Sequence, residues 1–123
     1  MTIVKAANRL VLSILLAAAT CAAHAEQVAD GIAWTKSSED MHVAYIRAIS
    51  DVLSASYQYD EKHFPGQQDT FSHKAVQGLG DTTVIEAVKG VNAWYKAHPD
   101  QLTTPVLKVI WLAMAKPNLT KSK

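Results

Sequence analysis

Histidines and carboxylates are the side chains in this sequence that could bind a metal or move a proton. Four histidines follow residue 25, and no two of them are spaced four residues apart, as two zinc ligands on one helix turn would be. A zinc site needs three or four converging ligands. The alternative is a site in the middle of the chain made by His63 and His73 with Asp60, Glu61 or Asp69. The spacing favours surface histidines, and we expect no bound metal and no cofactor.

Nucleophilic catalysis needs a nucleophile, a base and an orienting group held together. The single cysteine, Cys21, lies near the N-terminus, and no serine stands in a G-x-S-x-G or S-x-x-K motif. The residues on either side of the doublet Asp60-Glu61 indicate that this pair of carboxylates is exposed. The stretch Gly78-Leu79-Gly80 is only a fragment of a phosphate-binding loop. The sequence therefore predicts a protein that is not an enzyme.

Aromatic residues gather in the middle of the chain and suggest recognition instead: Tyr57, Tyr59, Phe64 and Phe71. Exposed aromatic side chains supply contact area at a low entropic cost. The same residues would equally serve to anchor this segment to the rest of the protein, and both interpretations stay open. Charged neighbours would add contacts that steer an encounter with a partner: Asp60, Glu61 and Lys62.

The segment that carries most of these residues, Tyr59–Thr82, breaks every helical pattern. It contains Pro65-Gly66, Gly78 and Gly80 among polar residues, which predicts a loop of 24 residues. Residues 72–77 form at most one turn of helix within it. Loops of this length are uncommon in compact domains and are often functional. We therefore expect Gly78→Ala and Gly80→Ala to leave stability almost unchanged.

The first of three helical patterns begins at Ser37–Asp40, where hydroxyl caps are followed by acids. Two apolar stripes run along it, and they predict a central helix that is buried on two sides. One stripe is Met41, Tyr45, Ala48 and Val52, and the other is Val43, Ile46, Leu53 and Tyr57.

Two more helices follow the predicted loop. One begins at the capping box Thr83–Glu86 and ends at His98-Pro99. The other begins with Thr104 as cap and Pro105 at its first position, and ends at Lys116-Pro117. Its expected buried stripe is Leu107, Ile110, Trp111 and Met114. The predicted fold is all-α: a small bundle of three main helices, a short N-terminal helix within residues 26–38 near Trp34, and one long loop.

Residues 1–25 have the pattern of a secretory signal peptide. Lys5 and Arg9 precede an apolar run of ten residues, and Ala23-His24-Ala25 is a cleavage motif. The run is too short for an ordinary membrane-spanning helix. Lipidation at Cys21 and a retained anchor remain alternatives, although Thr20 is not the small residue expected before a lipidated cysteine. The sequence predicts export to the periplasm, followed by cleavage after Ala25.

The remaining residues, 26–123, have the length of a single domain. Apart from Lys5 and Arg9, ten basic residues stand against eleven acidic ones, so no cationic excess is left to bind nucleic acid. The high apolar content and near-zero net charge argue against disorder. Without cysteine in this part, the domain has no disulfide.

Two stretches resemble the Rap/Tai family, the immunity proteins that protect against amidase effectors of type VI secretion systems. The first is Ala44–Leu53, A-Y-I-R-A-I-S-D-V-L, which is similar to the first-helix signature G-Y-[IV]-x-G-[VI]-x-D-[AV]. The second runs from Val84 to Pro117 and carries V-I-E-A-V-K-G-V-N-A-W-Y-K-A-H-P-D, then Pro105 and a helix that ends A-M-A-K-P. The sequence differs from many members in lacking their cysteines, since His42 and Asn118 stand at two of those places.

The resemblance implies a periplasmic protein that binds a cysteine hydrolase which cuts the peptide stems of peptidoglycan. Inhibition would be steric, through a protruding segment that fills the substrate cleft. Family members are often dimeric, so a homodimer is also implied as an option. The other interpretation is a small periplasmic helical binding or stress-chaperone module. The expected partner contacts are Tyr57, Tyr59, Asp60, Glu61, Lys62, His63, Phe64, Gln67, Asp69, Phe71 and His73.

Overall fold

The computed structural model describes residues 29–120, and within them the chain is all-α, as predicted. The elements are α2 (Gly31–Lys36), α3 (Glu39–His63), α4 (Phe71–Leu79), α5 (Val84–Ala97), α6 (Val106–Ile110), a π-helical turn η1 (Trp111–Ala115) and α7 (Lys116–Leu119). None of the helices in this described part is long and apolar enough to cross a membrane. The predicted signal peptide, residues 1–25, lies outside the described residues.

Local capping explains where the helices begin. The Asp30 carboxylate accepts from the Ala33 N–H and starts α2, the predicted short N-terminal helix. Ser38 caps α3 in the same way, and Thr83 and Glu86 form the predicted capping box of α5. These starts are readable from sequence because each depends on residues within one turn.

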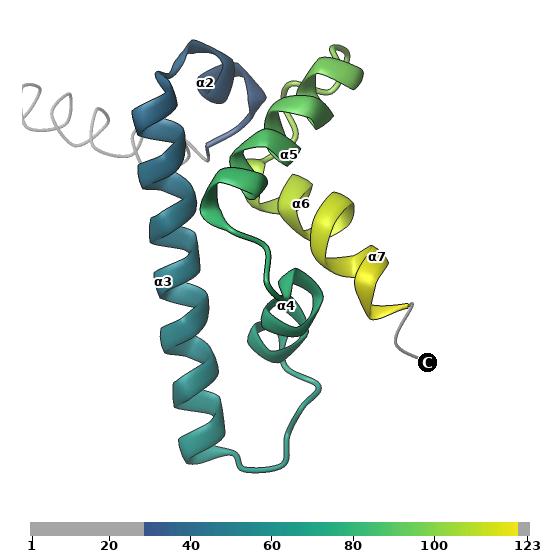
Figure 1. Ribbon diagram of the computed structural model, residues 1–123. Helices are drawn as coiled ribbons and strands as arrows, with labels where there is room; N and C mark the ends of the chain where they lie inside the picture. Colours follow the sequence, from purple (N-terminus) through teal and green to yellow (C-terminus); the bar gives the residue numbers. More distant parts are fainter. Residues whose placement is uncertain (1–28, 121–123) are drawn as a thin grey trace, which may run out of the picture.

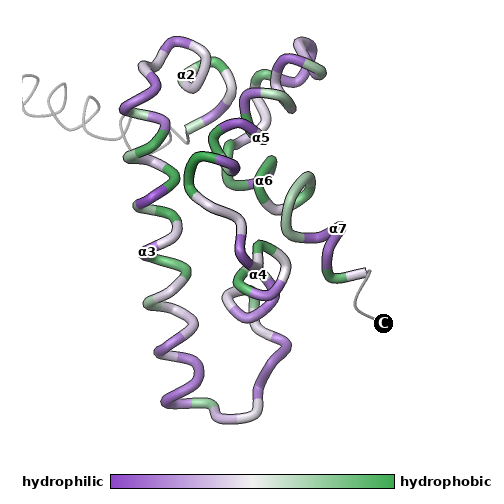
Figure 2. Tube along the Cα trace, viewed as in Figure 1, coloured by the Kyte–Doolittle hydropathy of each residue, from purple (hydrophilic) through white to green (hydrophobic). Residues whose placement is uncertain are grey.

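The hydrophobic core lies at one end of the molecule, between α2, the first half of α3, α5 and α6 (Figure 1). Figure 2 shows hydrophobic segments in α5 and α6, whereas the far end of α3 and the chain after it are largely hydrophilic. The largest fully buried side chains among residues 29–120 are those of Val91, Val106 and Val109. The core members are Trp34, Ile46, Ala87, Val88, Val91, Tyr95, Val106, Val109 and Ile110.

The predicted buried stripe of the third helix is confirmed at Ile110, which is buried, and wrong at Leu107. Leu107 is 40% exposed, whereas Val106 and Val109 are buried. Contacts with the segment before α2 fix the start of α6. The Val106 N–H donates to the Ala29 carbonyl at 2.8 Å, and Pro105 forms an isolated antiparallel β-bridge with Asp30. This contact between distant parts of the chain turns Val106 inward.

The wide turn η1 precedes Pro117. Proline has no N–H and its ring clashes with the carbonyl four residues back. Here the helical turn contains one extra residue. The Lys116 N–H therefore donates to the carbonyl of Trp111, five residues earlier. The helix thereby continues through the proline into α7, whereas the sequence predicted that it would end there.

The prediction that α3 is buried on two sides is also wrong. Met41 is 61% exposed and Val52 is 68% exposed, although Ile46 and Leu53 on the other stripe are buried. Figure 1 shows α3 along one side of the molecule, with α4 and α5 on the same side of it. The helix is therefore an edge element with one packed face.

The loop predicted for Tyr59–Thr82 is largely helical. Helix α3 continues to His63, α4 occupies Phe71–Leu79, and only residues 64–70 connect them. Polar residues do not end a helix, and the break comes at Pro65-Gly66, where Gly66 has φ +86°. The expectation for Gly78 and Gly80 is wrong as well. An added Cβ at Gly78 would lie 2.4 Å from the Ala115 carbonyl oxygen, and Gly80 has φ +50°, a backbone conformation that residues with a side chain rarely adopt.

Candidate functional site

Most of the predicted contact residues lie at the end of an antiparallel pair formed by α3 and α4. We call residues 57–73 the hairpin tip. It comprises the last turns of α3, the connection 64–70 and the first turn of α4. In Figure 1 this tip projects beyond the helices that enclose the core.

Capping groups close both helices at the hairpin tip. The Phe64 N–H donates to the Asp60 carbonyl at 2.8 Å, which ends α3. Thr70 starts α4, since its hydroxyl accepts from the His73 N–H at 3.3 Å. Between them Gly66 supplies the positive φ needed for the turn.

A network of polar side chains ties α3 to α4 at the hairpin tip. The Ser72 hydroxyl donates to Asp60 Oδ2 at 2.5 Å, and Ser72 Oγ lies 3.0 Å from Thr70 Oγ1. His73 uses both ring nitrogens: Nδ1 lies 2.7 Å from Thr70 Oγ1, and Nε2 lies 2.7 Å from Glu61 Oε1. The bonds to Asp60 and Glu61 join groups that local sequence pattern does not place together.

His73 is the centre of this network. Only 8% of its side chain is exposed, and its ring lies against Tyr57 with centroids 4.6 Å apart. Asp60 Oδ2 lies 3.9 Å from His73 Nδ1. A buried imidazole satisfied at both nitrogens fixes the positions of its neighbours, since losing either bond would leave a buried polar atom unpaired.

The charge at Asp60 is favoured by its partners. The hydrogen bond from Ser72 is the largest cause that holds the pKa of Asp60 below its ordinary value, and the nearby His73 contributes, against the opposing effect of burial. Asp69 is different, because it is exposed and pairs with Lys74, whose ammonium lowers the pKa of the Asp69 carboxyl. The Asp60–Ser72 interaction joins α3 to α4, whereas the Asp69–Lys74 pair lies at the start of α4.

The chain of Glu61, His73 and Thr70 has the order of an acid, a base and a hydroxyl. The Thr70 hydroxyl, however, already interacts with Ser72 Oγ, His73 Nδ1 and the His73 N–H. A hydroxyl has one donor and two acceptor positions, so these contacts use its full capacity. The arrangement is therefore suited to holding the hairpin tip in shape.

Exposed aromatic side chains lie on the outside of the hairpin tip. Tyr59 is 56% exposed and Phe64 is 46% exposed. The Tyr59 ring stacks on His63 at 4.1 Å and meets Phe64 edge-on at 6.3 Å. We call these three residues the aromatic cluster. Lys62 and Gln67, close to it in the sequence, are exposed too.

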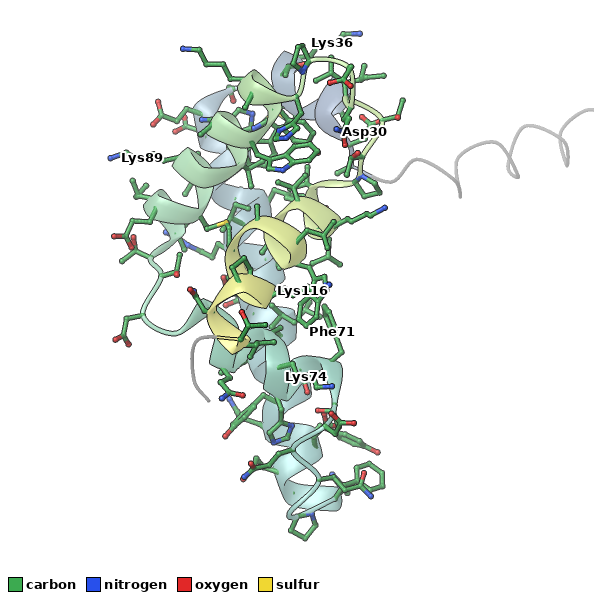
Figure 3. The ribbon with its side chains drawn as sticks, turned by 90° about the vertical axis from the view of Figure 1, so that its right-hand side faces the viewer. Asp30, Lys36, Phe71, Lys74, Lys89 and Lys116 are labelled. Carbon is green, nitrogen blue, oxygen red and sulfur yellow. The ribbon has the colours of Figure 1, made fainter. Side chains whose placement is uncertain are left out.

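Phe71 lies apart from the aromatic cluster. It is 50% exposed, and its ring packs on Trp111 of η1 at a centroid distance of 5.1 Å. Figure 3 shows Phe71 beside the C-terminal helices, with Lys74 further along the same element. Phe71 thus anchors α4 to η1, which is the second of the two roles considered for these aromatics.

The structure therefore divides the predicted contact residues into three groups. Tyr57, Asp60, Glu61 and His73 meet in the network. Tyr59, Lys62, His63, Phe64 and Gln67 are exposed on the outside, and Asp69 and Phe71 have separate local partners.

Sequence reasoning missed two hydroxyl residues of the network, Thr70 and Ser72. Their signal was present, because a threonine before a helical turn is a typical cap. A shallow cavity of ≈ 230 Å³ also lies here, lined by Tyr57, Gln68, His73, Val76 and Gln77.

The two histidines that were considered as metal ligands do not meet. His63 stacks on Tyr59 at the surface, whereas His73 is buried between α3 and α4. Among residues 29–120, no three His, Cys, Asp or Glu side chains are grouped so that they could hold a metal ion.

Comparison with known proteins adds no relative: no family model, no curated protein and no solved structure matches the chain.

Proposed function

We propose that this chain is a periplasmic immunity protein that binds a peptidoglycan amidase effector of a type VI secretion system and inhibits it sterically. The observation that supports this proposal most is the projecting hairpin tip, which presents the aromatic cluster away from the core. A protruding, aromatic-bearing segment has the form needed to fill a substrate cleft. The sequence resemblance supplies the identity of the partner.

The polar network gives the hairpin tip the rigidity that an inhibitor needs. His73 and Ser72 on α4 hold Glu61 and Asp60 on α3. A segment ordered before binding loses less conformational entropy when it binds, and this raises affinity. The aromatic cluster then supplies apolar contact, while Lys62 and Glu61 at the surface add charged contacts that steer association.

The steric mechanism assigns no chemistry to the chain itself. The hairpin tip would occupy the cleft that receives the peptide stem, so the substrate could not reach the catalytic cysteine of the amidase. The aromatic cluster would be the centre of the contact, because a few buried aromatic residues carry most of the binding energy at such interfaces.

The first test is isolation of the partner. The tagged chain, exported by its own N-terminal segment, is purified from the periplasm of the native host during type VI activity. We expect one stoichiometric partner with a cysteine–histidine hydrolase sequence, whose amidase activity the chain inhibits. The absence of such a partner, or a mixture of unfolded clients, would contradict the proposal.

The second test locates the contact. Tyr59→Ala and Phe64→Ala should each raise the inhibition constant at least about tenfold, since aromatic residues at the centre of an interface are worth about 2 kcal/mol or more. Ile85→Ala on α5 is the control, because Ile85 is also exposed, at 48%, but lies outside the hairpin tip. Circular dichroism should show the same helix content for all three variants. Equal inhibition by all of them would exclude the aromatic cluster from the contact.

Exposed apolar side chains outside the hairpin tip favour one second candidate, a helical stress chaperone. Leu107 and Leu112 are 40% and 42% exposed on the C-terminal helices. A chaperone would suppress aggregation of many unfolded proteins at acid pH, whereas an immunity protein would protect only against its amidase partner. An aggregation assay at low pH separates the two.

A further inference from the structure

One side of the C-terminal helices is largely exposed and combines apolar with basic side chains. Helix α6, the turn η1 and α7 follow one another without a break, and Val106 and Val109 pack into the core. The opposite side carries five residues that we call the basic face: Leu107, Lys108, Trp111, Leu112 and Lys116. Figure 3 looks onto this side of the molecule, with Lys116 in front.

The wide turn η1 keeps the basic face continuous along the helix. The Trp111 N–H donates to the Leu107 carbonyl, and the Lys116 N–H donates to the Trp111 carbonyl. Leu107, Trp111 and Lys116 therefore lie on three successive turns. In an ordinary α-helix the residue one turn after Trp111 would be Ala115, which is only 1% exposed. The extra residue of η1 brings Lys116 to the surface instead.

The apolar part of the basic face is accessible. Leu107 and Leu112 are 40% and 42% exposed. Trp111 is half-buried, and its ring contacts Phe71, itself 50% exposed, at a centroid distance of 5.1 Å. The exposed apolar surface thus extends from the C-terminal helices onto the start of α4.

The charge of this part of the chain has a single sign. Residues 101–123 contain four lysines and neither aspartate nor glutamate, and Lys108 and Lys116 are exposed on the basic face. Helix α3 also exposes apolar side chains, but there the exposed acids Asp40 and Asp51 neighbour them in the sequence. An apolar helix face with lysines and no acids of its own is typical of a surface helix that binds anionic lipid.

We propose that the basic face binds the surface of a bilayer that contains anionic phospholipid. In this arrangement Leu107, Trp111 and Leu112 enter the region of the headgroups. The ammonium groups of Lys108 and Lys116 contact the lipid phosphates. Tryptophan favours this boundary, because its ring is apolar and its N–H is polar.

The basic side chains favour a lipid surface over an acidic protein as the occupant. All four basic residues of 101–123 are lysines, and none is an arginine. Lysine is a point charge on a flexible stem, whereas arginine is the residue that recognises a fixed carboxylate by two parallel hydrogen bonds. A lysine stem lies along apolar area while its ammonium reaches outward. A bilayer offers what these side chains fit, which is mobile anionic groups above an apolar layer.

This inference is independent of the proposed amidase partner. The aromatic cluster lies on the hairpin tip, and none of its residues belongs to the basic face. Binding to a bilayer therefore leaves the hairpin tip open to a protein partner. Leu107 and Leu112 also support the stress-chaperone candidate, but a chaperone for unfolded proteins has no requirement for Lys108 and Lys116. The two lysines separate these roles.

Co-sedimentation with vesicles tests the proposal. The purified chain, as its host processes it, is mixed with vesicles of phosphatidylcholine that contain about 30% phosphatidylglycerol. We expect binding at low ionic strength that weakens as salt is added, since salt screens the attraction between lysines and headgroups. Vesicles of phosphatidylcholine alone should bind little of the chain.

Substitutions on the basic face should weaken vesicle binding. Lys108→Gln and Lys116→Gln should each weaken it about fivefold, as expected for one lysine near an anionic surface. Leu112→Ser should also weaken it about fivefold, because part of the leucine side chain no longer leaves water on binding. The controls on α5 are Lys89→Gln and Ile85→Ser, at exposed positions outside the basic face, and both should bind as the wild type does.

Further measurements separate this proposal from the proposed function. Thermal unfolding of each variant checks that the fold is intact. The double variant Lys108→Gln/Lys116→Gln should inhibit the amidase as the wild type does, and Tyr59→Ala should bind vesicles normally. Failure of one proposal therefore leaves the measurement for the other unchanged.

Three outcomes would overturn the membrane proposal. The first is a wild-type chain that does not bind anionic vesicles at low ionic strength. The second is equal weakening by the variants of the basic face and by the controls on α5. The third is binding to poly-glutamate without binding to anionic vesicles, which would assign the basic face to an acidic protein.

Discussion

At the scale of single residues, the largest difference from expectation is His73. The sequence favoured surface histidines, and His63 fits that description, but His73 is buried with both nitrogens bonded. Its partners come from positions 61 and 70, and the first of these lies twelve residues away on another helix. Local spacing identifies the residue types of such a network, but it cannot show that two helices bring them together.

The network at Asp60 predicts a pH dependence of stability. Because hydrogen bonding lowers the folded-state pKa of Asp60, the charged carboxylate stabilises the fold in full above the unfolded pKa of about 3.9. That stability is lost as the pH falls through the lower, folded-state value. We expect Asp60→Asn to reduce stability near neutral pH and to flatten its decline below about pH 4.

Urea unfolding at a series of pH values measures this effect. Asp51→Asn, at an exposed position of the same helix, is the control for the loss of one negative charge from α3. If Asp60→Asn and the wild type decline in parallel, the Asp60 interaction makes no pH-dependent contribution.

At the scale of elements, the close crossing of α4 and η1 depends on Gly78. A Cβ there would lie 2.4 Å from the Ala115 carbonyl oxygen, so the helices would have to move apart. Asn118 Nδ2 also donates to the Gly78 carbonyl at 2.8 Å across the same crossing. In the sequence this glycine stands in a polar stretch, which is typical of a loop, and no local pattern indicates the distant segment that packs on it.

Gly78→Ala should therefore lower the free energy of unfolding by about 1–3 kcal/mol through overpacking. Gly80→Ala is the matched control. Gly80 has φ +50° and only one atom within contact range, at 3.9 Å, so the change there adds backbone strain without a clash. With ψ −126° the backbone lies outside the left-handed helical region, and the expected cost is about 1–3 kcal/mol. Denaturant titrations measure both losses, and a loss below about 0.5 kcal/mol for Gly78→Ala would contradict the crossing argument.

At the scale of the whole molecule, the fold class and the starts of α3 and α5 were predictable, whereas the arrangement was not. The predicted cap of the third helix is wrong, because Pro105 rather than Thr104 is the N-cap of α6 and no side chain caps it. The caps at Ser38 and Thr83 depend on neighbouring residues. The position of α3 at an edge depends on which of two apolar stripes the rest of the chain covers. Both stripes have helical spacing, so their periodicity could not distinguish a face for the core from a face that remains exposed.

Hydrogen exchange should show a division between the two ends of the molecule. Amides of α5 around Val91, whose side chain is fully buried, are expected to exchange only on global unfolding. Amides of Tyr59–His63 should exchange through local opening, because mostly exposed side chains surround them. Native-state exchange at increasing denaturant measures both. Equal opening free energies at the two ends would mean that the hairpin tip unfolds only with the core.

The distance between the core and the hairpin tip has an evolutionary consequence. Tyr59, Lys62, Phe64 and Gln67 are not among the core residues or those packed against them, so substitutions there can accumulate without loss of folding. Under the proposed function, a changing amidase partner selects for substitutions at this surface while the helical frame stays constant. Sequence divergence would then concentrate at the hairpin tip, and the substitution rate there would follow the rate at which the amidase partner changes.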